Sequence, residues 1–150
     1  MALKEQISDE MKAALLGGNR FVGETLRNLK AAILNEEVAQ GKRDEGLSDA
    51  DIEKVIAREA KKRIESAKVY RDNSRPELAE PEEQELAILQ QYLPKQMTED
   101  ELRAIVKEKI AELGATSPVM MGQVIGAVKQ AAGNTADGAV VAQIVKQELN

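Results

Sequence analysis

The sequence predicts an all-α protein, with an N-terminal bundle of long helices followed by a small C-terminal three-helix bundle. Apolar residues recur at the spacing of a helix through almost every segment, and no segment keeps the two-residue alternation of a strand. Of the 150 residues, 43% are hydrophobic and 31% are charged, as expected for amphipathic helices that each turn one face to water. With one Phe, two Tyr and no Trp, the core must be aliphatic.

The composition limits the chemistry that the chain can perform. The sequence has no Cys and no His, which excludes disulfides, thiolate or imidazole metal sites, cysteine nucleophiles and histidine bases. It has no phosphate-binding loop, dinucleotide fingerprint or zinc motif, so no cofactor and no metal are expected. The net charge of −5 argues against broad non-specific binding of nucleic acid but leaves room for a local basic patch. Without an apolar signal core or a stretch of membrane-spanning length, a cytoplasmic location without a membrane partner is expected.

Local signals predict the first three helices. The first is expected over residues 3–16, where Gly17-Gly18 ends it, and the second over residues 19–40. Ser48 should cap the third helix, because its hydroxyl can accept a hydrogen bond from a free backbone N–H of the first turn. The apolar faces of the second and third helices are expected to be buried. They comprise Val22, Leu26, Leu29 and Ile33 in the second helix, and Ile52, Val55, Ile56, Ile64, Ala67 and Tyr70 in the third.

Prolines predict the breaks that follow. A fourth segment opens at Arg75-Pro76, and Pro81 should divide it into a short helix and a longer one over residues 82–92, since proline lacks a backbone N–H. Pro94 should end that helix, because the residue before a proline disfavours the helical conformation.

The chain should therefore form two domains. We expect residues 1–95 to form the N-terminal helical domain and residues 96–150 the C-terminal three-helix bundle, joined by a hinge at residues 93–97. A capping box that begins at Thr98 immediately after the hinge starts a new helix, which Gly114 closes. The next helices should begin at Ser117-Pro118 and near residues 135–137. The expected buried residues are Leu102, Ile105, Val106, Ile110, Leu113, Val141, Ile144, Val145 and Leu149.

Several short motifs follow one another along nearly the whole chain. They are the segment 26–33, Val55-Ile56 with the basic run to Tyr70, Arg75 with Leu78-Ala79, Tyr92-Leu93-Pro94, Met121-Gly122 with Val124-Ile125-Gly126, Asp137-Gly138 and Val145-Lys146. Each motif is short, but their order and spacing together resemble the YqeY family. The family is related to the tail domain of the B subunit of the amidotransferase that acts on aspartyl- and glutamyl-tRNA.

This resemblance implies a function. The amidotransferase converts glutamate or aspartate, misacylated on tRNA, to the amide with ammonia from glutamine, and its tail contacts the tRNA without doing chemistry. The resemblance therefore implies a tRNA-binding module, and the family label also implies carbon–nitrogen ligase activity with glutamine as amido-N-donor. One turn departs from the family pattern of Gly-Arg/Lys-Ala-Asp-Gly. Here it begins at Asn134, Thr135 replaces the cation, and Ala139 stands where a Lys is common, so two phosphate contacts are not carried over.

Two regions supply candidate nucleic-acid contacts. In the basic run of the third helix we select Lys61, Lys62 and Lys68. Helical spacing puts Lys54, Arg58, Lys61 and Lys68 near one stripe, which could follow a phosphate backbone. The alternative is a solvated face that carboxylates neutralise. The full run comprises Lys54, Arg58, Lys61, Lys62, Arg63, Lys68 and Arg71, interleaved with Glu53, Glu59 and Glu65.

In the C-terminal part the candidates are Lys129, Lys146 and Gly138, which we expect to flank the turn before the last helix. Glycines there could let a nucleic-acid backbone come close. The alternative is structural: Gly122 and Gly126 would let two helices pack tightly, and Asp137 would cap the last helix.

The remaining polar residues predict no catalytic residue. The carboxylates of Glu82, Glu83 and Glu85 follow Pro81, where the start of a helix favours negative charge more readily than a metal. Three functions remain: a non-catalytic module for tRNA that assists translation, an adaptor for a protein of the translation or amidotransferase machinery, and a glutamine-dependent ligase. A contiguous basic surface would favour the first, an exposed apolar groove the second, and a deep polar pocket the third.

Overall fold

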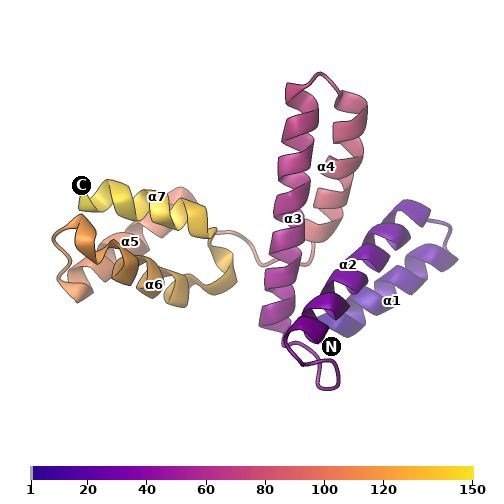
Figure 1. Ribbon diagram of the computed structural model, residues 1–150, viewed down its shortest axis with the longest axis horizontal. Helices are drawn as coiled ribbons and strands as arrows, with labels where there is room; N and C mark the ends of the chain where they lie inside the picture. Colours follow the sequence, from indigo (N-terminus) through magenta and orange to yellow (C-terminus); the bar gives the residue numbers. More distant parts are fainter. Residues whose placement is uncertain (1) are drawn as a thin grey trace. The chain divides into compact units, whose positions relative to one another are not determined.

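The computed structural model describes residues 2–150 and confirms the all-α prediction. Over these residues the chain forms seven α-helices and two short 3₁₀-helices, with no strand (Figure 1). Contacts divide it into two compact units, one ending at Leu93 and the other comprising Pro94–Asn150. None of the helices in this part of the chain is long and apolar enough to cross a bilayer.

The first unit consists of two antiparallel helical hairpins. Helices α1 (Leu3–Leu16) and α2 (Arg20–Ala39) form one, and α3 (Asp49–Asp72) and α4 (Pro76–Gln90) form the other. The helices of each hairpin lie side by side, whereas the two hairpins meet at one end and diverge from there (Figure 1). The core lies where the hairpins meet. It contains Ile7, Leu26, Leu29, Ile33, Leu47, Ile52, Val55, Ile56, Ala60, Leu89 and Tyr92.

Local signals gave the correct starts of α2 and α3. The side chain of Asn19 accepts a hydrogen bond from the N–H of Val22 at 3.3 Å, and that of Ser48 accepts one from Asp51 at 3.2 Å. Ile64, however, is 49% exposed, so its expected burial was wrong. The reason is that the second half of α3 packs on α4 alone (Figure 1), which leaves it a narrower buried face.

Pro81 does not break α4, contrary to the prediction. The helix runs unbroken from Pro76 to Gln90 with Pro81 inside it. Proline removes one hydrogen bond, but α4 packs along α3, and burial on both sides of Pro81 fixes the helix: Ala79 is fully buried and Leu89 is 1% exposed. Packing along the hairpin therefore outweighs the local penalty.

The segment after α4 folds back onto the first hairpin. Tyr92 is 8% exposed, and its hydroxyl donates a hydrogen bond to the carboxylate of Glu10 on α1. Burial raises the pKa of the Tyr92 hydroxyl, and the neighbouring Glu10 raises it further. Tyr92 and Leu93 thus close the first unit.

The second unit is built from α5 (Glu99–Leu113), α6 (Met121–Ala132) and α7 (Gly138–Leu149), each in contact with the other two. The 3₁₀-helices η1 (Pro118–Met120) and η2 (Gly133–Thr135) flank α6. The core is aliphatic, as composition predicted. It contains Leu102, Val106, Ala115, Val124, Val128, Val141, Ile144, Val145 and Leu149.

In this unit the cap at Thr98 and the stop at Gly114 are confirmed, whereas the burial of Leu113 and an α-helix that starts at Ser117-Pro118 were wrong. Thr98 accepts a hydrogen bond from the N–H of Glu101 at 3.2 Å, as expected of a capping box. Leu113 is 41% exposed, because the left-handed turn at Gly114 directs the chain back and buries Ala115 instead. Ser117 makes no side-chain cap. Its carbonyl accepts from the N–H of Met120 at 3.1 Å, which closes a 3₁₀ turn before α6 begins.

Candidate functional site

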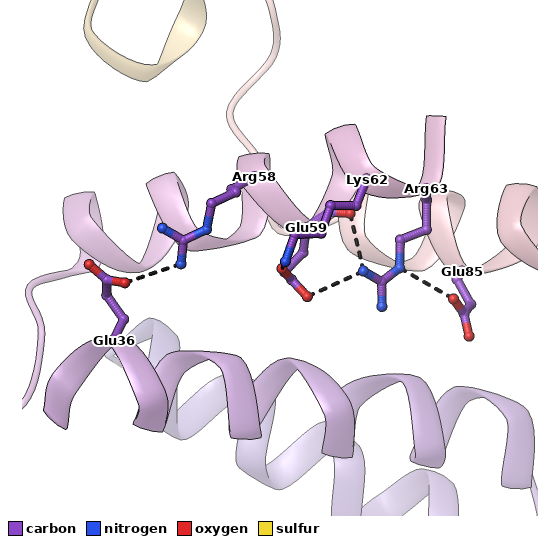
Figure 2. A network of polar contacts seen from close by, with 6 residues as sticks. All are labelled: Glu36, Arg58, Glu59, Lys62, Arg63 and Glu85. Carbon is purple, nitrogen blue, oxygen red and sulfur yellow. Dashed lines mark hydrogen bonds and ion pairs between the residues drawn. The ribbon is translucent and has the colours of Figure 1, made fainter. Parts of the chain in front are cut away.

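The basic run of α3 lies within a network of ion pairs. Arg58 contacts Glu36 of α2 at 3.2 Å, and Arg63 contacts both Glu59 at 3.2 Å and Glu85 of α4 at 3.3 Å (Figure 2). The remaining paired cations of the run continue the same pattern. The pairs are Lys62 with Glu59 at 2.8 Å, Lys54 with Asp51 at 3.9 Å, Lys68 with Asp72 at 3.9 Å and Arg71 with Glu83.

These pairs lower the pKa values of the carboxylates involved. Hydrogen bonds from Gln40 and Arg58 hold the pKa of Glu36 below its ordinary value. Burial would raise the pKa of Glu59, but Lys62 and Arg63 together bring it below its ordinary value. Both carboxylates therefore stay charged at neutral pH and offset the neighbouring cations. Of the three candidates chosen on α3, Lys62 and Lys68 are paired, and Lys61 has no ion pair within residues 2–150.

A polar groove lies beside this network, between α2 and α3. Its volume is about 540 Å³, and Arg58, Glu59 and Lys62 line one side. The amides of Asn28 and Asn35 lie opposite, on α2. The groove thus presents both signs of charge together with amides, and it is not a positively charged channel.

The three carboxylates after Pro81 do not lie at a helix start, so the expected compensation of the helix dipole was wrong. Because α4 begins at Pro76, they lie in its middle, where Glu83 pairs with Arg71 and Glu85 with Arg63 of α3. Burial raises the pKa of Glu82, and the charge of Glu85 adds to the shift. In the described part of the chain, no three carboxylates lie close enough to hold a metal ion.

Of the three C-terminal candidates, Lys129 and Gly138 lie close together and Lys146 lies apart from them. A Cβ built on Gly138 would lie 3.2 Å from the Nζ of Lys129, so the Lys129 ammonium lies over the start of α7. The side chain of Asp137 caps this helix, accepting from the N–H of Ala139 at 2.8 Å. Lys146 lies in the last turn of α7, roughly 12 Å along the axis from Gly138 at 1.5 Å per residue. It therefore does not flank the turn.

The two glycines of α6 do not mediate helix packing, contrary to the structural alternative. A Cβ built on Gly122 or on Gly126 would meet nothing within 4 Å, and both residues are exposed. They lie four residues apart, and so occupy one outward face of the helix. Glycine costs about 1 kcal/mol relative to alanine inside a helix, and no contact of this unit offsets that cost.

The chain segment that contains this face carries little charge. Between Glu112 and Asp137 the sequence has no carboxylate, and its one cation is Lys129. Lys129 follows Gly126 by three residues and so lies near the same face. We define the α6 face as Gly122, Gly126 and Lys129, together with Val119, which precedes α6 and is 93% exposed.

Sequence reasoning missed one buried charge, Glu37 of α2. Its side chain is fully buried, and its carboxylate accepts hydrogen bonds from Lys4 of α1 at 2.8 and 2.9 Å and from the N–H of Leu47 at 3.1 Å. The bond from Lys4 is the main reason that the pKa of Glu37 lies below its ordinary value. The signal was present, because Glu37 follows Ile33 by four residues on the apolar face.

The fold defines a class of all-helical proteins that join two helical hairpins to a three-helix unit. Comparison with known families then assigns the chain: the family model described as Yqey-like protein matches residues 4–149, and the chain belongs to this YqeY family. Among curated proteins it is similar to the altered inheritance of mitochondria protein 41, mitochondrial, of Clavispora lusitaniae (strain ATCC 42720). The two are 28% identical over 92 residues, which cover 61% of this chain and 52% of that protein. The chain thus matches about half of that relative's length.

Proposed function

We propose that this chain is a non-catalytic module that binds tRNA through the α6 face and assists translation. We choose tRNA as the ligand because the family is related to the amidotransferase tail, which contacts tRNA. The observation that carries the proposal is a helix face with exposed glycines and one cation, within a segment that lacks carboxylates although the chain is acidic. The expected compartment stays the cytoplasm.

The glycines let another molecule come close to the backbone of α6. A side chain at Gly122 or Gly126 would hold another molecule several ångströms from the helix, whereas glycine lets a sugar–phosphate backbone lie against it. Lys129 then provides a charge for a phosphate, and residues 113–136 themselves add no carboxylate that would repel a polyanion. Gly138 lies beside Lys129 and extends the surface.

Lys61, Lys62, Lys68 and Lys146 become secondary contacts in this proposal. Lys62 and Lys68 already have carboxylate partners, so a phosphate would have to compete with them. Lys61 and Lys146 have no ion pair in residues 2–150 and could add charge at the edges of a complex. With so few unopposed cations, we expect micromolar affinity or weaker, a steep loss with salt and tolerance of different tRNAs.

The test is a titration of labelled tRNA at two salt concentrations. Gly126→Glu places a carboxylate on the α6 face at a position with room for it, and should abolish most of the binding. Ala13→Glu makes the same charge change on an exposed position of α1 and serves as the matched control. Equal affinities for the two variants would exclude the α6 face, and absence of binding by the unmodified chain at low salt would end the RNA proposal.

The ligase alternative has its own expected outcome. The sequence contains no Cys, no His and no phosphate-binding loop, so the purified chain should neither hydrolyse glutamine nor cleave ATP. Both activities can be measured against a mock preparation. Turnover that one substitution in this chain abolishes would reject the non-catalytic proposal.

A further inference from the structure

A second surface of the molecule, on the first hairpin, is independent of the proposed RNA contact. A groove of about 260 Å³ lies between α1 and α2. Ile33 and Leu34 form its apolar floor with Ala31, and Lys4 and Lys30 stand at its edges. Leu34 is 44% exposed although it is a large aliphatic residue in a well-packed unit.

The apolar surface continues beyond the groove along α2. Val38, four residues after Leu34, is 58% exposed. Ala31, Leu34 and Val38 therefore occupy positions i, i+3 and i+7 of one helix face, the spacing at which a second helix inserts its side chains. A face of this kind suits a helical partner better than a small molecule.

The charges beside the groove indicate the character of the partner. Lys30 donates a hydrogen bond to the hydroxyl of Ser8 at 3.0 Å and has no carboxylate partner within residues 2–150. Lys4 pairs with Glu37, whose carboxylate is buried below the groove, so one positive charge remains in the lining. The neighbouring Arg27 adds no net charge, because it pairs with Glu24 at 3.4 Å. Lys30 is therefore the cation that a carboxylate of a partner would meet, in a chain whose net charge is −5.

We propose that this groove binds an acidic amphipathic helix of a partner protein. The apolar seam of the partner would cover Ala31, Leu34 and Val38, and its flanking Asp or Glu residues would lie near Lys30 and Lys4. A second copy of the chain fits less well, because pairing the groove with itself would bring together two Lys30 ammonium groups that have no carboxylate partner in residues 2–150. The proposal concerns a protein ligand of the first unit and does not depend on RNA binding by the second.

The experiment uses the full chain and two synthetic helical peptides. Both peptides carry Leu at the seam positions of three heptads, but one has Glu and the other has Lys at the flanking positions. Amide chemical shifts of the isotope-labelled chain report binding. The acidic peptide should perturb residues 27–38 and the surroundings of Lys4, and bind at least about tenfold more tightly than the basic one.

Two variants make the test specific. Leu34→Asp should weaken the acidic peptide about tenfold or more, and Lys30→Glu should remove the preference for the acidic peptide. Unchanged thermal unfolding of Leu34→Asp, and unchanged tRNA titration of both variants, would separate this surface from folding and from the RNA proposal. Equal binding of the two peptides, perturbation that spares residues 27–38, or a dimer in sedimentation that Leu34→Asp dissociates would overturn the assignment.

Discussion

Helices α3 and α6 differ in how their charges are arranged. Both are candidate contacts for a polyanion, but α3 carries many cations that are held by carboxylates of α2, α3 and α4 (Figure 2). Helix α6 carries one cation, Lys129, and its segment has no carboxylate at all. The exposed glycines of α6 add an open backbone that α3 lacks.

The comparison shows that a surface for a polyanion is identified by cations that lack neighbouring carboxylates, and not by the number of cations. On α3 the cations have a structural role, since Arg63 and Arg71 join α3 to α4 and Arg58 joins it to α2. The pairs of Arg58 and Arg71 are largely exposed, and exposed pairs contribute about 0–1 kcal/mol each, so they guide packing more than they stabilise it. The second unit has an aliphatic core, and an ion pair between Arg103 of α5 and Glu148 of α7 at 2.7 Å also joins two of its helices.

The largest effect should come from breaking the aliphatic core of the second unit. Ile144 is 1% exposed, so Ile144→Ala should reduce the free energy of unfolding of this unit by about 2–5 kcal/mol. Ile64→Ala on α3 removes the same atoms from a side chain that is 49% exposed and should cost much less. Chemical denaturation followed by circular dichroism measures both.

A related measurement asks whether the two units fold separately. If they do, Ile144→Ala moves one transition and leaves that of the first unit in place, and residues 96–150 alone form a helical fragment that melts cooperatively. A small domain is marginally stable, so a low melting temperature is consistent with this prediction. A fragment without helical structure, in conditions where the full chain is folded, would contradict it.

The next effect concerns the polar contacts of the first unit. Glu37→Gln keeps the shape of the side chain but removes the charge that Lys4 contacts, and should cost about 1–3 kcal/mol. Glu24→Gln removes the exposed partner of Arg27 and should change stability by less than about 1 kcal/mol. Similar losses of stability in both variants would show that the burial of Glu37 does not increase its contribution to stability.

The contribution of Glu37 should depend on pH in a defined direction. Because its pKa is lower in the folded than in the unfolded chain, its stabilisation is fully present above the unfolded value of about 4.3 and is lost as the pH falls through the folded value. The stability difference between the unmodified chain and Glu37→Gln should therefore be constant from pH 7 to about 5 and shrink below that. A difference that grows in acid would contradict this assignment.

The sequence predicted those features whose cause is local. Ser48, Thr98 and Asp137 cap helices as expected, because a cap depends on residues three or fewer positions away. Pro81 was misjudged because contacts with a distant helix keep α4 intact. For the same reason no local signal tells that Glu37 meets Lys4, which lies 33 residues earlier.

The candidate site was harder to predict than the fold. Cations on α3 are visible in the sequence, but their partners on α2 and α4 are not, so the sequence overstated the basic face. For the glycines of α6, the sequence suggested a buried role that the structure does not show. A pair four residues apart suggested helix packing, and only the three-dimensional arrangement places both on an open face.

The smallest expected effect is also the sharpest test of the α6 face. Gly126→Ala should stabilise the second unit by about 0.5–1 kcal/mol, because alanine favours a helix and nothing lies within 4 Å of its Cβ. Gly133→Ala, just past the same helix, should destabilise it, since Gly133 has a φ of +58° that alanine rarely adopts. If the open backbone of α6 serves to admit RNA, Gly126→Ala should weaken tRNA binding while it raises the melting temperature. A variant that gains stability and keeps its full affinity would leave Gly126 without a role in binding, and the α6 face would then depend on Lys129 alone.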